Sequence, residues 1–80
     1  MSDEDFARAV GQNVKAARET AGLTQKQLGE RAGIAPPHVS RLETGEHLPS
    51  LKTVKRVADS LGVEVADLLP KPARRRGGRK

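Results

Sequence analysis

Apolar residues recur at helical spacing in the first part of the chain. Phe6, Val10, Val14 and Ala17 follow one another at steps of four, four and three, so they fall on one side of a helix. Asp3, Glu4 and Asp5 come just before this stripe, where a helix dipole favours negative charge. The pattern therefore predicts an amphipathic helix over about residues 5–21.

Capping signals mark the shorter helices that follow. Thr24 is followed three residues later by Gln27, which is the pattern of a capping box, and Gly33 is suited to end that helix. Pro36 and Pro37 suit the first turn of the next helix, because the N–H groups that prolines lack have no helical partner there. These signals predict two short helices that are separated only by a tight turn.

A second long apolar stripe follows Ser50, which is suited to cap a helix. The expected buried side of this helix consists of Leu51, Val54, Val57, Ala58 and Leu61. No run alternates apolar and polar residues over the length of a strand. The sequence therefore predicts a compact all-α domain whose five helices cover about residues 5–21, 24–32, 36–43, 51–61 and 65–69.

Charge is distributed unevenly along the chain. The 80 residues carry a net charge of +5, but residues 71–80 hold six basic residues and no acidic one. This tail therefore carries +6 and residues 1–70 carry −1. We expect the folded domain to cover residues 1–70 and the Arg/Lys-rich tail of residues 71–80 to be disordered. A basic tail of this kind attracts a polyanion such as nucleic acid, or serves only as a solubilising end.

Composition excludes several classes of protein. The chain has no cysteine, so it forms neither a disulfide framework nor a cysteine-based zinc site. His38 and His47 stand nine positions apart and predict no metal site. Ser40 lies two positions from His38, which keeps their side chains apart on a helix, so we expect no catalytic pair, no cofactor and no enzyme. No apolar run approaches the roughly 20 residues of a membrane span.

The order of several short motifs resembles one known family. The matching positions are Leu23, Thr24, Gln25, Leu28, Ala32, Gly33, Val39, Ser40, Arg41, Leu42, Glu43, Gly45, Pro49, Leu51, Ala58, Leu61, Gly62 and Val63. This pattern resembles the lambda-repressor-like, Cro-type (XRE) helix-turn-helix domains over about residues 6–69. The resemblance implies that the second and third predicted helices form a helix-turn-helix and that the third lies in the major groove of duplex DNA.

Within this resemblance, the third predicted helix is expected to contact bases. Arg41 is the strongest candidate, because a guanidinium can donate to both O6 and N7 of guanine. Ser40 and His38 are expected to contact a base or a phosphate, and Pro36 and Pro37 to press on a thymine methyl group. The alternative for Arg41 is a helix charge that only meets solvent.

Other residues are expected to hold the sugar–phosphate backbone. Gln25 stands in the first turn of the second predicted helix, where N–H groups and the helix dipole favour an anion, and the resemblance implies a phosphate clamp there. Glu46 must either point away from the phosphates or limit the affinity. Weaker phosphate candidates in and after the loop that follows the third helix are Thr44, His47, Ser50 and Lys52.

Arg18 and Glu43 are expected to form an ion pair. The resemblance implies that an arginine late in the first helix pairs with a glutamate at the end of the third. Two interpretations stay open: the pair only fixes the angle between the helices, or it also directs Arg18 toward a phosphate.

The last predicted helix carries more apolar residues than its short length needs. We therefore expect a dimer interface formed by Val63, Val65, Leu68 and Leu69.

The predicted function is a repressor-like transcriptional regulator, located in the cytoplasm with the nucleoid, that binds a pseudo-palindromic operator as a homodimer. The alternatives are an antitoxin or bridging module with a protein partner, and a binder of RNA or single strands. The last of these needs aromatic stacking platforms, and Phe6 is the only aromatic residue.

Overall fold

The structure is a computed structural model that describes residues 1–70. Over this range the chain forms five helices and no strand, which confirms the predicted all-α fold. The helices are α1 (Asp3–Thr20), α2 (Gln25–Ala32), α3 (Pro36–Thr44), α4 (Leu51–Leu61) and α5 (Val65–Leu68). Residues 71–80, to which the expectation of a disordered tail applies, lie outside the described residues.

The first helix begins earlier than predicted. The hydroxyl of Ser2 accepts a hydrogen bond from the Asp5 N–H at 3.1 Å, so Ser2 caps α1 and the helix starts at Asp3. The three acidic residues form its first turn, where the positive end of the dipole stabilises them. At the other end of the sequence α5 stops at Leu68, one residue earlier than predicted.

The predicted caps of the middle helices are present. The Thr24 hydroxyl accepts from the Gln27 N–H at 3.0 Å, and the Gln27 side chain accepts from the Thr24 N–H at 2.9 Å. Ser50 caps α4 by accepting from the Thr53 N–H at 3.2 Å. The local sequence therefore decides where α2 and α4 start, as the capping patterns predict.

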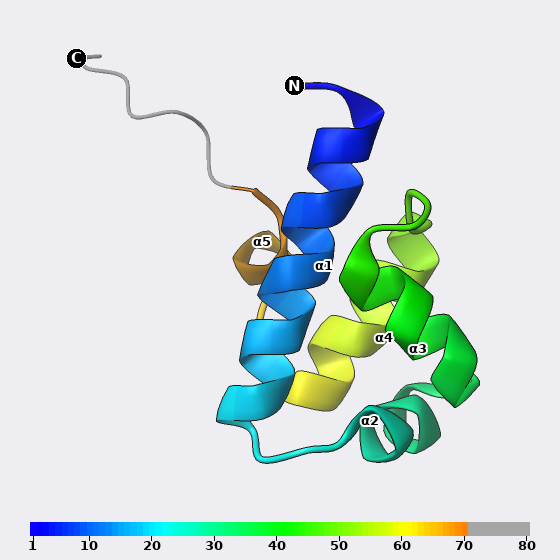
Figure 1. Cartoon of the computed structure of the whole chain (residues 1–80). Coiled ribbons are helices and arrows are strands. Elements are labelled where there is room, and N and C mark those ends of the chain that lie inside the picture. The colour runs from blue at the N-terminus through cyan, green and yellow to red at the C-terminus, as the bar shows by residue number, and fades with distance from the viewer. Residues whose placement is uncertain (71–80) are drawn as a thin grey trace, which may run out of the picture.

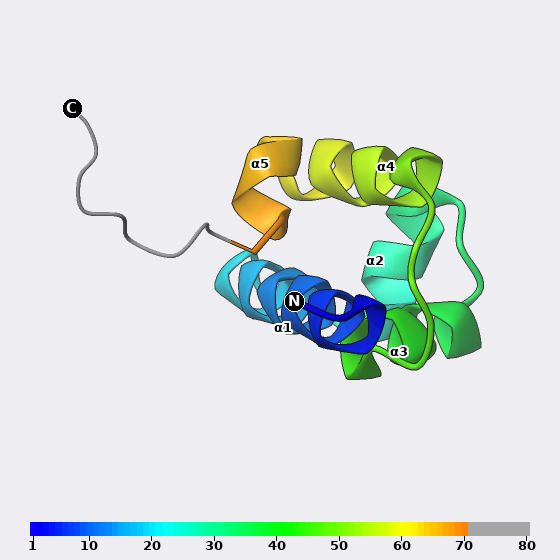
Figure 2. The same ribbon diagram turned by 90° about the horizontal axis from the view of Figure 1, so that it is seen from above.

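The helices enclose one apolar core. Figure 2 shows α1 and α4 as two layers, which α5 connects at one end while α2 and α3 lie toward the other. α1 packs against α3 and α5, and α4 packs against α2 and α5 (Figure 1). The largest side chains that are fully buried in it are Leu28, Leu68, Val10, Val14, Val39 and Val57.

Leu51 does not belong to this core, contrary to the prediction from its stripe. Its surface is 72% exposed, whereas Val54, Val57 and Ala58 on the same helix are buried. Leu51 is the first residue of α4. It lies about one turn before Val54, where the start of the helix extends past the core. Helical spacing predicts which side of a helix faces the core, but it does not predict how far along the helix the core extends.

Two glycines bring the backbone of α1 close to the end of α3. A Cβ atom at Gly11 would overlap the carbonyl oxygens of Leu42 and Glu43, and one at Gly45 would overlap the backbone of Arg8. Gly45 also has a φ of 76°, in the left-handed region that side chains other than glycine rarely adopt. The C-terminal end of α3 is thus fixed directly against the backbone of α1.

Candidate nucleic-acid interface

α2 and α3 are joined by a turn of three residues. Gly33 ends α2 with a φ of 72°, and the N–H of Ile34 donates to the Gly29 carbonyl at 2.8 Å. A Cβ atom at Gly29 would overlap the Ile34 carbonyl, so the turn folds back closely on α2. The two short helices and their tight turn form the helix-turn-helix that the sequence predicts.

α3 keeps one side in the core and presents the other to solvent. Val39, Leu42 and Glu43 are buried, and Ser40 is half-buried. The remaining predicted base-contact residues are exposed: Pro36, Pro37, His38 and Arg41. The side of α3 that was predicted to contact bases is therefore accessible along most of the helix.

Arg18 and Glu43 form the predicted ion pair. The Arg18 Nε donates to Glu43 Oε2 at 2.6 Å and its Nη2 donates to Oε1 at 3.1 Å, in a two-point contact. The two side chains are only 11% and 3% exposed. The hydrogen bond to Glu43 raises the pKa of the Arg18 guanidinium above its ordinary value, burial opposes this, and the carboxylate charge adds to it.

Further donors complete the surroundings of this pair. The Arg18 Nη1 donates to the Leu23 carbonyl at 2.8 Å, and the Gln25 Nε2 donates to Glu43 Oε1 at 3.0 Å. Glu43 therefore links the end of α1, the start of α2 and the end of α3. The bond from Gln25 was not predicted, since nothing in the linear pattern relates positions 25 and 43.

The hydrogen bonds around Glu43 affect whether Arg18 and Gln25 can contact a phosphate. The guanidinium of Arg18 is turned toward Glu43 and Leu23 and is nearly buried, which favours the interpretation that the pair fixes the helix angle. Gln25 uses one amide hydrogen on Glu43 and retains a second, because a side-chain amide has two. The geometry thus leaves a phosphate contact open to Gln25 but gives no support for one from Arg18.

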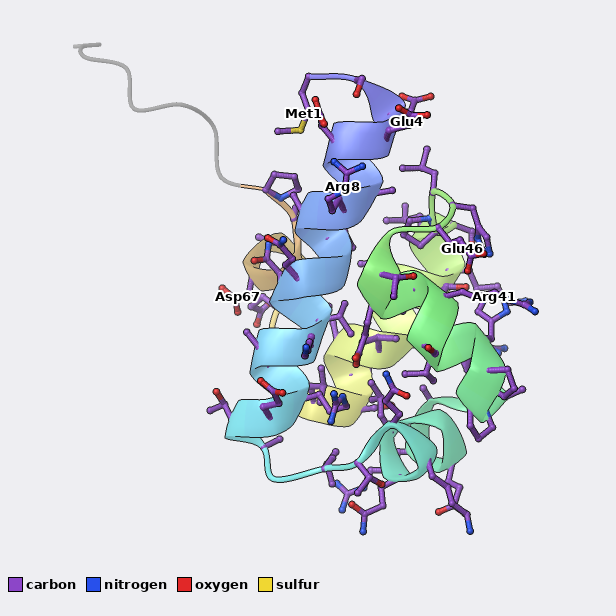
Figure 3. The ribbon with its side chains drawn as sticks, viewed as in Figure 1. Met1, Glu4, Arg8, Arg41, Glu46 and Asp67 are labelled. Carbon is purple, nitrogen blue, oxygen red and sulfur yellow. The ribbon has the colours of Figure 1, made fainter. Side chains whose placement is uncertain are left out.

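The loop after α3 folds back over the helix. The Glu46 carboxylate lies 4.0 Å from the Nε of Arg41, and Figure 3 shows the two side chains next to each other at the edge of the molecule. The rings of His38 and His47 meet edge to face, with centroids 5.7 Å apart. Glu46 therefore lies along the exposed side of α3 rather than pointing away from it.

Two of the weaker phosphate candidates have internal partners. The Thr44 hydroxyl donates to the Arg41 carbonyl at 3.1 Å. The Ser50 hydroxyl donates to the Thr53 hydroxyl at 3.1 Å, besides capping α4. His47 and Lys52 are exposed.

Leu68, one of the four residues expected at a dimer interface, lies in the core instead of on the surface. Leu68 has none of its surface exposed, because it packs inside with the core residues of α1 and α4. Val63, Val65 and Leu69 pack against this core but are half-buried. Asn13 holds the end of α5 in place, since its Nδ2 lies 3.1 Å from the Leu68 carbonyl and 3.3 Å from that of Leu69. No sequence signal identified Asn13.

Two further findings concern residues 1–70 alone. No three histidine or carboxylate side chains among them gather closely enough to hold a metal ion. None of the five described helices combines the length and the apolar character needed to cross a membrane.

Comparison with known proteins agrees with this geometry. A family model described as helix-turn-helix, HTH_3, matches residues 14–68. The immunity repressor protein of Bacillus phage phi105 is 38% identical over 60 residues, which are 75% of this chain but 42% of the repressor, so the chain spans less than half of that protein. The uncharacterized HTH-type transcriptional regulator y4dJ of Sinorhizobium fredii is 34% identical over 81% of this chain and 84% of its own length.

A solved structure extends the comparison to a complex. The crystal structure of SinR, the master regulator for biofilm formation, in complex with DNA superposes with a TM-score of 0.70 and 32% identity. The match covers 74% of this chain and 95% of the SinR chain. The chain belongs to the HTH_3 helix-turn-helix family, of XRE/Cro type, and is a DNA-binding domain of the kind found in HTH-type transcriptional regulators.

Proposed function

We propose that this chain acts as a repressor-like transcriptional regulator that recognises an operator with the exposed side of α3. One observation carries the proposal: Val39, Leu42 and Glu43 fix α3 in the core while His38 and Arg41 stay accessible. A helix held in this way can enter the major groove while its partner helix crosses the backbone. The naming of the phage phi105 relative as an immunity repressor supports the same function.

Base recognition is assigned chiefly to Arg41. Its side chain is 56% exposed, and a guanidinium that donates to O6 and N7 of one guanine contributes about 1–3 kcal/mol of discrimination. His38, Pro36 and Pro37 add contacts along the same side, with the prolines suited to a thymine methyl group. Ser40 is half-buried and contributes less.

Phosphate contacts are assigned to residues at both ends of the helix-turn-helix. Gln25 keeps a second amide hydrogen, and the capping box of Thr24 and Gln27 leaves the N–H groups of Gln25 and Lys26 without a helical acceptor, so together they suit one phosphate. His47 and Lys52 are exposed after α3 and suit a phosphate there. These contacts orient α3 without reading sequence.

A homodimer on a pseudo-palindromic operator is the proposed assembly. Two copies in this arrangement would read half-sites about 34 Å apart, which is one turn of the duplex. Val63, Val65 and Leu69 are the proposed contacts between the copies, without the buried Leu68. The proposed location is the cytoplasm, with the nucleoid.

Selection of bound duplexes from a random pool tests this function. We expect a preferred half-site that contains guanine, present twice with a spacing near one helical turn. The selected duplex should compete far better than its separated single strands. Equal binding of all sequences, or stronger binding of single strands, would contradict the proposal.

A further inference from the structure

The backbone at the end of α3 fixes Glu46 next to Arg41. The Glu46 N–H donates to the Arg41 carbonyl at 3.1 Å, and the Gly45 N–H donates to that of Leu42 at 3.2 Å. These bonds are those of a Schellman motif, in which the chain turns back over the last helical turn. Because Gly45 also lies directly against the backbone of Arg8, the motif is held in place by α1.

The carboxylate of Glu46 lies near the Nε of the Arg41 guanidinium, at a distance too long for a hydrogen bond. The distance between Glu46 Oε1 and Nε is 4.0 Å, so the edge formed by the two Nη groups stays available to other acceptors. That edge carries the paired N–H groups that can donate to O6 and N7 of one guanine. The contact between the rings of His38 and His47 holds the same loop to α3 at a second point.

The pair is too exposed to matter much for the stability of the free protein. The side chains of Arg41 and Glu46 are 56% and 62% exposed, and pairs of this kind contribute little in water. In the groove of a duplex, water is displaced and the attraction between the two groups grows. The carboxylate also repels the phosphates that would otherwise draw Arg41 away from the bases.

We propose that Glu46 is a positioning residue that aims Arg41 at guanine and lowers the affinity for unrelated sequences. This inference rests on the proposed recognition of DNA by α3. Glu46 thereby increases the ratio of specific to non-specific binding, at some cost in total affinity. A residue that only weakened binding would lower the affinity for all duplexes alike and leave this ratio unchanged.

A set of four variants tests this role. Glu46→Gln removes the charge, Arg41→Ala removes the group it acts on, and the double variant combines them. Glu19→Gln is the matched control, because it removes one negative charge from the exposed end of α1, which lies at the opposite end of the molecule from residues 45–50 (Figures 1 and 2). Thermal unfolding followed by circular dichroism checks that each variant is folded.

Binding is measured on the selected duplex, on the same duplex with the guanine replaced, and on random duplex. Glu46→Gln should raise the affinity for random duplex by about two- to fivefold and lower the discrimination for guanine. In the Arg41→Ala background the same change should leave base discrimination unaltered. Glu19→Gln should leave discrimination as in the unaltered chain.

Three results would overturn the inference. Glu46→Gln could leave guanine discrimination unchanged, it could act equally with and without Arg41, or Glu19→Gln could reproduce its effects. None of these three results affects the proposed function, provided that the unaltered chain still prefers one duplex. An unaltered chain that prefers no duplex refutes the proposed function itself, and the inference with it.

Discussion

Arg41 is the residue on which the proposed base recognition depends most. Its exposed side chain contributes little to the core, so Arg41→Ala should leave stability nearly unchanged. We expect the variant to lose about 1–3 kcal/mol of discrimination at one guanine. Fluorescence anisotropy with duplexes that differ at that base pair measures this loss. Arg56→Ala, an exposed arginine on α4, is the control and should lower affinity without changing the preferred base.

Glu43 differs from Glu46 in burial, although both carboxylates lie next to an arginine. Glu43 is 3% exposed and accepts hydrogen bonds from Arg18 and Gln25. Removing it leaves a nearly buried guanidinium without its counter-charge, so Glu43→Ala should lower the free energy of unfolding by about 3–5 kcal/mol. Denaturation with urea measures the change. The exposed Glu46→Ala should cost less than about 1 kcal/mol, and equal losses would contradict this interpretation.

At the scale of elements, the position of α3 depends on its close approach to α1. Gly11 is buried inside α1, where alanine would ordinarily be the better helix former by about 1 kcal/mol. Because a Cβ atom there overlaps two carbonyl oxygens of α3, Gly11→Ala should instead destabilise the domain by about 1–3 kcal/mol.

Thermal unfolding of two variants, Gly11→Ala and Ala16→Gly, tests this packing. Ala16→Gly, at an exposed position of the same helix, should destabilise through helix propensity alone. A Gly11→Ala variant that is more stable than the unaltered chain would show that α1 and α3 can separate freely. We also expect Gly11→Ala to weaken operator binding, since it displaces the end of α3 and with it Arg41 and Glu46.

At the scale of the whole molecule, the basic residues 71–80 should raise the affinity for any duplex, while the specificity should come from the helical part. The helical part carries −1, while residues 71–80 carry +6. Attraction to phosphates from the tail depends on salt and not on sequence. Removing residues 71–80 should weaken binding to all duplexes alike and reduce the slope of log K against log salt by up to about 5.

Binding at several salt concentrations, with the selected and the random duplex, measures this effect. The preferred half-site should stay the same, because Arg41 and the other exposed residues of α3 are retained. A change in the preferred sequence upon truncation would mean that the tail reads bases, as an arm in the minor groove does.

The local pattern of the sequence determined most of the fold. Spacing of apolar residues, capping residues and glycines act over a few positions, and they predicted five helices with errors of one or two residues at the ends. The resemblance to the Cro-type domains added the ion pair between Arg18 and Glu43, which the structure contains.

Only the tertiary structure decided which predicted residues are available for function. It placed Leu68 in the core and Leu51 outside it, turned Gln25 and Arg18 toward Glu43, and put Glu46 next to Arg41. These outcomes depend on where the ends of the helices lie relative to the core and to one another. Periodicity fixes the side of a helix that faces inward, but distances between side chains on different elements follow from packing, which no local pattern contains.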